Sequence, residues 1–165
     1  MKEIKNIREV KDNLVKLIAD DWGLVCAGKI DHCNGMTVSW GAIGELWGKD
    51  VVFAFIRPQR YTKEFIDNED YFTLSFFDEE YKDALRICGT KSGRDCDKLE
   101  LAKFTMTTDG DTVYPNEAKL VVKCKKLAVQ KMDSVGFIDK SIEKNYSDGD
   151  YHFVYVGEIV KILEK

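Results

Sequence analysis

Residues 120–129 read LVVKCKKLAV, and the apolar positions in this stretch change phase part-way along it. Those at 120, 122 and 124 fall on one face of an extended strand, because side chains alternate between the two faces. After the lysine pair at 125 and 126, the apolar positions move to 127 and 129. A one-residue change of phase inside a strand predicts a β-bulge or a sharp bend, which is common where a sheet curls into a barrel. The stretch therefore favours a small β-barrel.

Further strands are predicted on both sides of this stretch. Residues 151–160, YHFVYVGEIV, are apolar on both faces up to Gly157, which is typical of a central strand or of one covered by a partner. Residues 51–56, VVFAFI, form an apolar run typical of a buried strand, and Pro58 then ends it. Residues 72–77 alternate as a strand does. The segments 24–27 and 36–41 are predicted to be two strands joined by a turn at Asn34-Gly35.

Short helices are predicted between these strands. The apolar residues of the first 20 positions recur with helical spacing, so we expect a leading amphipathic helix over residues 1–20. Thr62 is predicted to cap a helix over 62–68, Asp78 the next helix, and Asp97 a third. The sequence thus predicts a single domain over residues 1–165 that is mainly β with short helices, its barrel spanning 22–165.

Composition and charge exclude several classes of protein. The chain has 165 residues, which suits one domain, and 29 acidic against 25 basic residues give a net charge of −4. This balance argues against a protein that binds nucleic acid by neutralising phosphates. No apolar run reaches about 18 residues and the start does not resemble a signal peptide, so we expect no membrane span and a cytoplasmic location. The five cysteines lack CxxC spacing, so we expect reduced thiols and no metal site.

Two segments are suited to bind a phosphate group. In residues 56–62, IRPQRYT, two arginines stand where a buried strand meets a helix, and helix N-termini attract anions. Residues 88–98, CGTKSGRDCDK, place glycines, hydroxyls and bases in a loop that opens onto a helix. The alternative is that Arg57 and Arg60 pair with acidic side chains, Thr62 only caps its helix, and the second segment is a solvated loop. Either segment could hold the phosphate.

The remaining motifs indicate a bound cofactor rather than a catalytic side chain. In residues 34–40, NGMTVSW, Thr37 and Ser39 are two positions apart beside Trp40, which suits a flat ring with polar edges. There is no P-loop, no GxSxG serine and no GxGxxG fingerprint. Of the two histidines, His152 in the apolar last strand is interpreted as a core residue. Few residues are suited to general acid–base catalysis, and two segments are suited to bind phosphate, so we expect a bound cofactor to supply the chemistry.

The segments NGMTVSWG, IRPQRYT, FTLSFF, CGTKSGRDCDK and YHFVYVGEIV, in this order, resemble the flavin reductase-like, flavoredoxin-type proteins. The likeness runs from about Trp22 to the C-terminus. It implies an FMN-binding split β-barrel that forms a homodimer, with FMN near the subunit interface. Many relatives carry a proline where this chain has Glu45-Leu46-Trp47, so the outer face of the ring site is expected to differ.

Carried over by residue, the resemblance gives thirteen cofactor-binding positions and no catalytic or metal-binding residue. Asn34, Met36, Thr37, Ser39 and Trp40 would border the isoalloxazine ring or the ribityl chain. Arg57, Arg60, Tyr61 and Thr62 would take the phosphate end. Ser92, Gly93, Arg94 and Lys98 match the family's Ser-Gly-Arg loop and would also line the flavin site, with Arg94 and Lys98 expected to stabilise the reduced ring.

The expected function is that of an FMN-dependent oxidoreductase. A hydride would pass from NADH or NADPH to FMN, and the electrons would go on to flavin, ferric iron or a protein acceptor. Two alternatives stay open at this point. One is a flavoredoxin-type electron carrier without NAD(P)H activity of its own. The other is a module that binds a different phosphorylated small molecule and no flavin.

Overall fold

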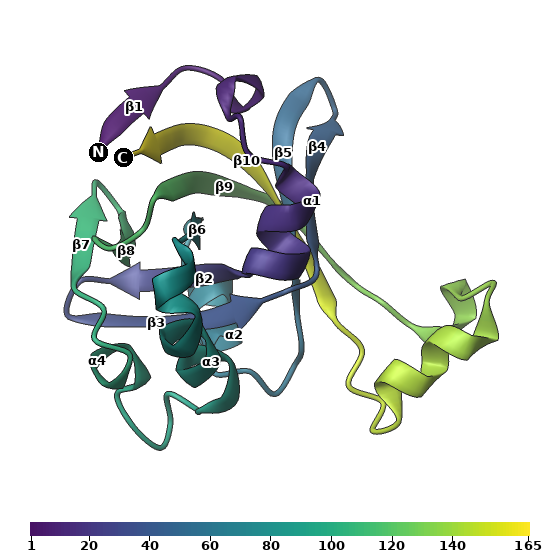
Figure 1. The fold of residues 1–165 in the computed structure, drawn as a ribbon. Coiled ribbons are helices and arrows are strands. Elements are labelled where there is room, and N and C mark those ends of the chain that lie inside the picture. Colours follow the sequence, from purple (N-terminus) through teal and green to yellow (C-terminus); the bar gives the residue numbers. More distant parts are fainter.

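One antiparallel sheet of eight strands curls around the core in the computed structural model, which describes residues 1–165 (Figure 1). Seven strands follow one another in the order β3-β2-β6-β9-β10-β5-β4, and β1 pairs with the end of β10. Because β3 and β4 do not pair with each other, the barrel stays open along one seam. The bounds of these strands are β1 Lys2–Ile4, β2 Gly23–Lys29, β3 His32–Val38, β4 Gly41–Leu46, β5 Lys49–Ile56, β6 Tyr71–Phe76, β9 Leu120–Lys131 and β10 Phe153–Glu164. The prediction of a mainly β barrel with short helices is confirmed.

The predicted irregularity in the long strand β9 is present, at Leu127. Val156 of β10 pairs with Ala128 and Gly157 pairs with Lys126, so Leu127 is left over between them. Gly157 is required here, because a Cβ atom on it would lie 2.6 Å from the ring of Phe72. The extra residue bends β9 and lets the sheet close over its own core. Of the two alternatives for the last strand, the central position is confirmed, since β10 pairs with β9 on one side and with β5 on the other.

Two hydrophobic clusters fill the molecule, one on each side of the sheet. Successive residues of a strand face opposite sides, so Val25 of β2 belongs to the cluster inside the barrel and Leu24 to the outer cluster. The outer cluster is covered by α3 Lys82–Thr90, by α4 Lys98–Leu101 and by the hairpin of β7 Met106–Asp109 and β8 Thr112–Pro115. The remaining helices are α1 Leu14–Lys16, which continues as a π-helical turn over Leu17–Asp21, and α2 Thr62–Asn68.

The prediction of one leading helix over residues 1–20 is wrong for the first 13 residues. Lys2–Ile4 form β1, which pairs with the end of β10, and Ile7–Glu9 form a 3-10 turn. The side chains of Asn6 and Asn13 each accept a hydrogen bond from a backbone N–H of the turn that follows. Two such caps break the segment into separate turns, although the apolar spacing alone fits one helix.

The expected turn at Asn34-Gly35 is also wrong. Lys29 pairs with His32, so the turn between β2 and β3 lies at residues 30 and 31, and Asn34 pairs with Ala27 inside the sheet. Gly35 serves close packing instead, since a Cβ there would lie 2.9 Å from the Cys26 sulfur. The hairpin of β4 and β5 was not expected. Its two turn residues, Trp47 and Gly48, both have positive φ angles, 58° and 72°.

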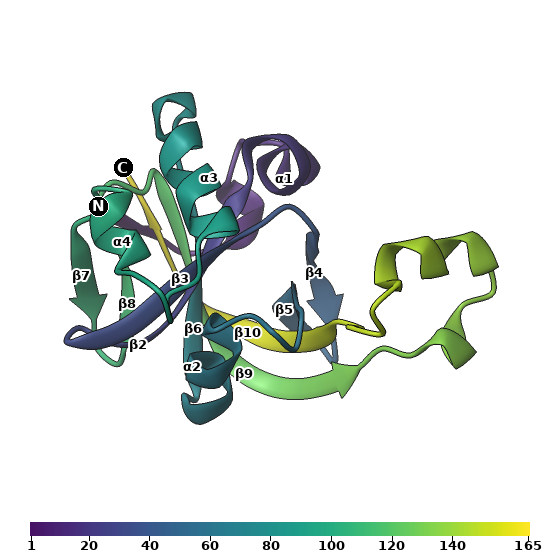
Figure 2. The same ribbon diagram turned by 90° about the horizontal axis from the view of Figure 1, so that it is seen from below.

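Residues 132–152 form an arm between β9 and β10 that projects away from the barrel, as Figure 2 shows from a second direction. The arm contains two 3-10 segments, Ser134–Gly136 and Lys140–Tyr146. Two of its apolar side chains, Val135 and Ile138, are 89% and 100% exposed. The structure contains no helix with the length and apolar character needed to cross a bilayer.

Candidate functional site

A pocket of about 170 Å³ lies where β3 and β5 end and β10 begins. Its lining comes from four places in the chain that the sheet topology brings together. The lining residues are Met36, Thr37, Val38, Ser39, Trp40, Phe55, Arg57, Arg60 and His152. Six of them belong to the predicted cofactor-binding set, and they come from both the 34–40 and the 56–62 segments.

A second pocket, of about 210 Å³, is lined by four more of the predicted residues, namely Asn34, Tyr61, Gly93 and Lys98. The three predicted residues that line neither pocket are Thr62, Ser92 and Arg94. The two predicted basic segments nevertheless meet. A Cβ on Gly93 would lie 2.4 Å from Asn34 Oδ1 and 2.8 Å from the Tyr61 ring, so this glycine lets the two loops touch.

For Arg57 the alternative that it pairs with an acidic side chain is confirmed. Its Nη1 donates to Asp150 Oδ2 at 2.5 Å, and its Nη2 donates to the backbone carbonyl of Asn145 at 2.9 Å. Asp150 also accepts a hydrogen bond from Gln59, and these two donors hold the pKa of its carboxyl below the usual range. Asp150 lies 93 positions away in the chain, so the local sequence gave no sign of this pair.

Arg60 is the cation of the first pocket that has no carboxylate partner. It forms no ion pair, and its single hydrogen bond runs from Nη1 to the carbonyl of Gly89 at 2.8 Å. A guanidinium group has five N–H donors. Arg60 is half-buried and lines the pocket with most of these donors free. It is therefore the group best placed to bind an anion there.

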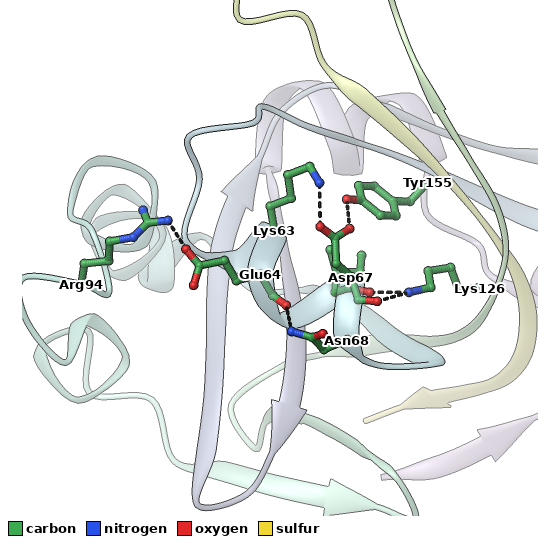
Figure 3. Close-up of polar contacts among 8 residues, drawn as sticks. Lys63, Glu64, Asp67, Asn68, Arg94, Lys126 and Tyr155 are labelled. Carbon is green, nitrogen blue, oxygen red and sulfur yellow. Dashed lines mark hydrogen bonds and ion pairs between the residues drawn. The ribbon is translucent and has the colours of Figure 1, made fainter.

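Arg94 is bound to α2 rather than to either pocket. Figure 3 shows its guanidinium paired with Glu64, and it also lies over the Tyr61 ring at 4.8 Å. On the other side of α2, Asp67 accepts from the Tyr155 hydroxyl at 2.5 Å, and Lys126 donates to the carbonyl of Asp67. These bonds hold α2 in place, and so they also hold the N-terminal end of α2, where the segment 57–61 leads into it.

Thr62 and Lys98 both have structural partners in addition to their predicted roles. Thr62 does not cap α2 as expected, because it is the first helical residue and its buried hydroxyl accepts from Asn34 Nδ2 at 2.7 Å. Lys98, 3% exposed, donates to the carbonyls of Cys88 at 3.1 Å and Lys91 at 3.4 Å. Burial lowers the pKa of Lys98. Its ammonium group thus stabilises the C-terminal end of α3.

The two hydroxyls predicted to face a ring are placed differently. Ser39 lies at the bend after β3, exposed and on the pocket wall. Thr37 also lines the pocket, but its Oγ1 donates to the carbonyl of Leu85 in α3 at 2.5 Å. Trp40, 48% exposed, lines the same pocket.

His152 is the titratable one among the three pocket residues outside the predicted set, the others being Val38 and Phe55. It is buried, as expected of a core histidine, but it also lines the pocket, with its ring 5.4 Å from that of Trp40. Its Nδ1 lies 2.8 Å from the Tyr146 hydroxyl. Burial, and then the charge of Arg57, lower the pKa of His152 to about 4. The position of His152 one residue before an apolar strand could have signalled a strand entrance, where pocket residues gather.

The sequence matches the family described as the flavin reductase like domain over residues 16–165. The chain belongs to the flavin reductase-like family. The resemblance noted in the sequence is thereby confirmed, and the match covers both basic segments, the NGMTVSW segment and the last strand. This chain has no match among curated protein sequences.

Solved structures with the same fold are distant in sequence from this flavin reductase-like protein. An FMN-binding protein from Thermus thermophilus, with bound p-hydroxybenzaldehyde, is 18% identical with a TM-score of 0.70 over 100% of this chain and 82% of its own. A protein with a split barrel domain from Shewanella frigidimarina is 15% identical, with a TM-score of 0.70 over 92% and 72%. An NADH:FAD oxidoreductase from Streptomyces globisporus, in complex with NAD and FAD fragments, is 13% identical, with a TM-score of 0.66 over 88% and 74%. The split-barrel fold is confirmed by these likenesses.

Proposed function

We propose that this protein binds FMN and acts as an oxidoreductase of the flavin reductase type. The observation that carries the proposal is the first pocket, which combines a guanidinium without a carboxylate partner, that of Arg60, with the exposed residues Ser39 and Trp40. A phosphomonoester needs a cation with free donors, and a tricyclic ring needs an apolar wall with a few polar atoms. The family membership supports this assignment, as do the FMN-binding protein and the NADH:FAD oxidoreductase that share the fold.

In this proposal the side chains bind and orient, and none of them is a nucleophile. Arg60 holds the phosphate, and Met36, Ser39 and Trp40 border the ring. When bound, FMN would supply the redox chemistry, taking a hydride from NADH or NADPH and passing electrons to flavin, ferric iron or a protein acceptor. Arg57 completes the positive wall but keeps its bond to Asp150, so it contributes less net charge than Arg60.

We also propose that a second copy of the chain completes the site. A volume of about 170 Å³ is below the ~300–1,000 Å³ of most small-molecule sites, so one chain covers only part of a ligand of this size. The homodimer implied by the family resemblance would supply the missing wall. The arm over residues 132–152, which projects from the barrel and exposes Val135 and Ile138, is the surface that we assign to this contact. Sedimentation of the purified protein tests it, and a monomer at micromolar concentration would contradict it.

The first experiment is a visible spectrum of the purified protein, followed by anaerobic mixing with NADH and NADPH separately. We expect flavin absorption bands, release of FMN on denaturation, and bleaching of the bands by at least one nicotinamide. Bands that neither nicotinamide bleaches would identify an electron carrier instead. A colourless protein that does not take up added FMN would leave a different phosphorylated ligand as the answer. The five free thiols fit a reducing compartment, so we propose the cytoplasm as the site of action.

A further inference from the structure

One hydrogen bond within the arm involves His152, the arm residue that lines the pocket. The Tyr146 hydroxyl, at the end of the 3-10 segment Lys140–Tyr146, lies 2.8 Å from Nδ1 of His152. Both side chains are buried, with exposed fractions of 6%. Tyr146 stacks on Tyr151 with 4.9 Å between ring centroids, and on Phe137 at 5.7 Å. The hydroxyl is therefore held in one place by a small aromatic cluster.

The direction of this hydrogen bond follows from the number of available partners. The Tyr146 hydroxyl has no other hydrogen-bond acceptor in the protein than His152 Nδ1. If Nδ1 carried the proton and donated, the hydroxyl hydrogen of a buried tyrosine would be left without an acceptor, which is unfavourable. Tyr146 therefore donates and Nδ1 accepts. Since burial keeps His152 neutral, its single N–H proton must lie on Nε2.

Nε2 of His152 faces accessible space. Nε2 has no hydrogen-bond partner in the protein. Ser75 Oγ is the one side-chain polar atom that is both buried from solvent and unpartnered, so the unpartnered Nε2 must be accessible to solvent. The accessible space beside His152 is the first pocket, which it lines together with Arg60 and Ser39.

We propose that Tyr146 is a positioning residue of the cofactor site: it holds His152 in the Nε2–H tautomer and so directs an N–H donor into the pocket. The ligand atom that this donor meets would be an acceptor, a carbonyl or phosphate oxygen of FMN, and this part rests on the proposed function. The arm is thus part of the site of its own chain, in addition to any contact that it makes with a second copy.

Arg57 fixes the position of Tyr146 relative to the pocket. Its guanidinium carbon lies 5.1 Å from the centre of the Tyr146 ring, and the group also bonds Asn145 and Asp150, on both sides of Tyr146 in the chain. Arg57 therefore both lines the pocket and holds the arm in place. This structural role explains why its guanidinium is paired with Asp150, whereas an arginine that only bound phosphate would have no such partner.

The tautomer can be measured without any ligand. The chain has only two histidines, so a long-range proton–nitrogen NMR spectrum of the ¹⁵N-labelled protein contains two imidazoles, and a His32→Gln variant assigns them. We expect His152 in the wild-type protein to be purely Nε2–H at pH 7, and a mixture of tautomers in Tyr146→Phe. A wild-type Nδ1–H tautomer would overturn the proposal whether or not the variant folds. An unchanged single tautomer in a folded Tyr146→Phe would overturn it as well.

The pocket-side donor is tested with two matched variants and added FMN. His152→Gln keeps an amide N–H near the position of Nε2, whereas His152→Asn keeps a polar group only near Nδ1. We expect about a 2- to 10-fold loss of FMN affinity in His152→Asn, the value of one neutral hydrogen bond, and a smaller loss in His152→Gln. Equal affinity in both variants and the wild type would overturn the donor role. Failure of the wild type to bind FMN would overturn the proposed function, and the tautomer would still decide the role of Tyr146.

Discussion

Replacing Arg60 by alanine is the sharpest test of how the pocket holds its ligand. Arg60 has no carboxylate partner and uses one donor on the Gly89 carbonyl, so its charge is not neutralised within the chain. A charge-assisted hydrogen bond to a phosphate contributes about 1.5–3 kcal/mol, and each ~1.4 kcal/mol corresponds to a factor of ten. We therefore expect the dissociation constant for FMN to rise about 10- to 150-fold in Arg60→Ala. Arg57→Ala should show a smaller rise, because Arg57 is already paired with Asp150.

The assay is a titration of the flavin-free protein followed by quenching of FMN fluorescence, with circular dichroism to confirm the fold. Arg86→Ala is the matched control. Arg86 also carries one positive charge, but its side chain is 58% exposed on α3 and pairs with Asp83 away from both pockets. We expect Arg86→Ala to bind FMN as the wild type does. If a folded Arg60→Ala binds FMN within twofold of the wild type, or if Arg86→Ala loses as much affinity, the assignment of Arg60 to the phosphate is wrong.

Three further predictions concern stability and reactivity. The pKa of His152 is lowered from 6.5 to about 4, so the unfolded chain binds the extra proton as the pH falls. The free energy of unfolding of the wild type should therefore fall by about 2 kcal/mol between pH 7 and pH 5, and that of His152→Asn should not show this fall. Urea titrations at both pH values measure it, and an equal fall in the two proteins would contradict the prediction. Gly157→Ala should destabilise by about 1–3 kcal/mol through contact with Phe72, whereas Gly44→Ala, which meets no atom within 4 Å, should not. Burial raises the pKa of Cys88 to about 11, so mass spectrometry should find Cys88 unmodified by iodoacetamide until the protein unfolds.

The strands could be predicted because the positions of apolar residues along each strand are a local property of the sequence. The apolar phase change in residues 120–129 indicated the bulge that the structure places at Leu127, and the doubly apolar last strand indicated the centre of the sheet. Prediction from the sequence failed where a local signal was overridden by packing or was missing. Asn34-Gly35 is a strong turn signal, but packing of Gly35 against Cys26 keeps the pair inside β3. The Trp47-Gly48 turn carries no such signal, because its first residue is an aromatic with positive φ.

By itself the sequence determined that a mainly β barrel with two basic loops and a hydroxyl-bearing strand would form, and ten of the thirteen predicted positions line one of two pockets. The tertiary structure alone decided which cation is free. Arg57 is paired with an acid 93 positions away, Arg94 with one 30 positions away, and Arg60 with none. It likewise decided that His152 lines the pocket and that Nδ1 of His152 is hydrogen-bonded to the Tyr146 hydroxyl. The reason is physical: alternation and capping act between neighbours in the chain, whereas the charge and hydrogen-bond partners of a side chain depend on which strands the sheet brings side by side.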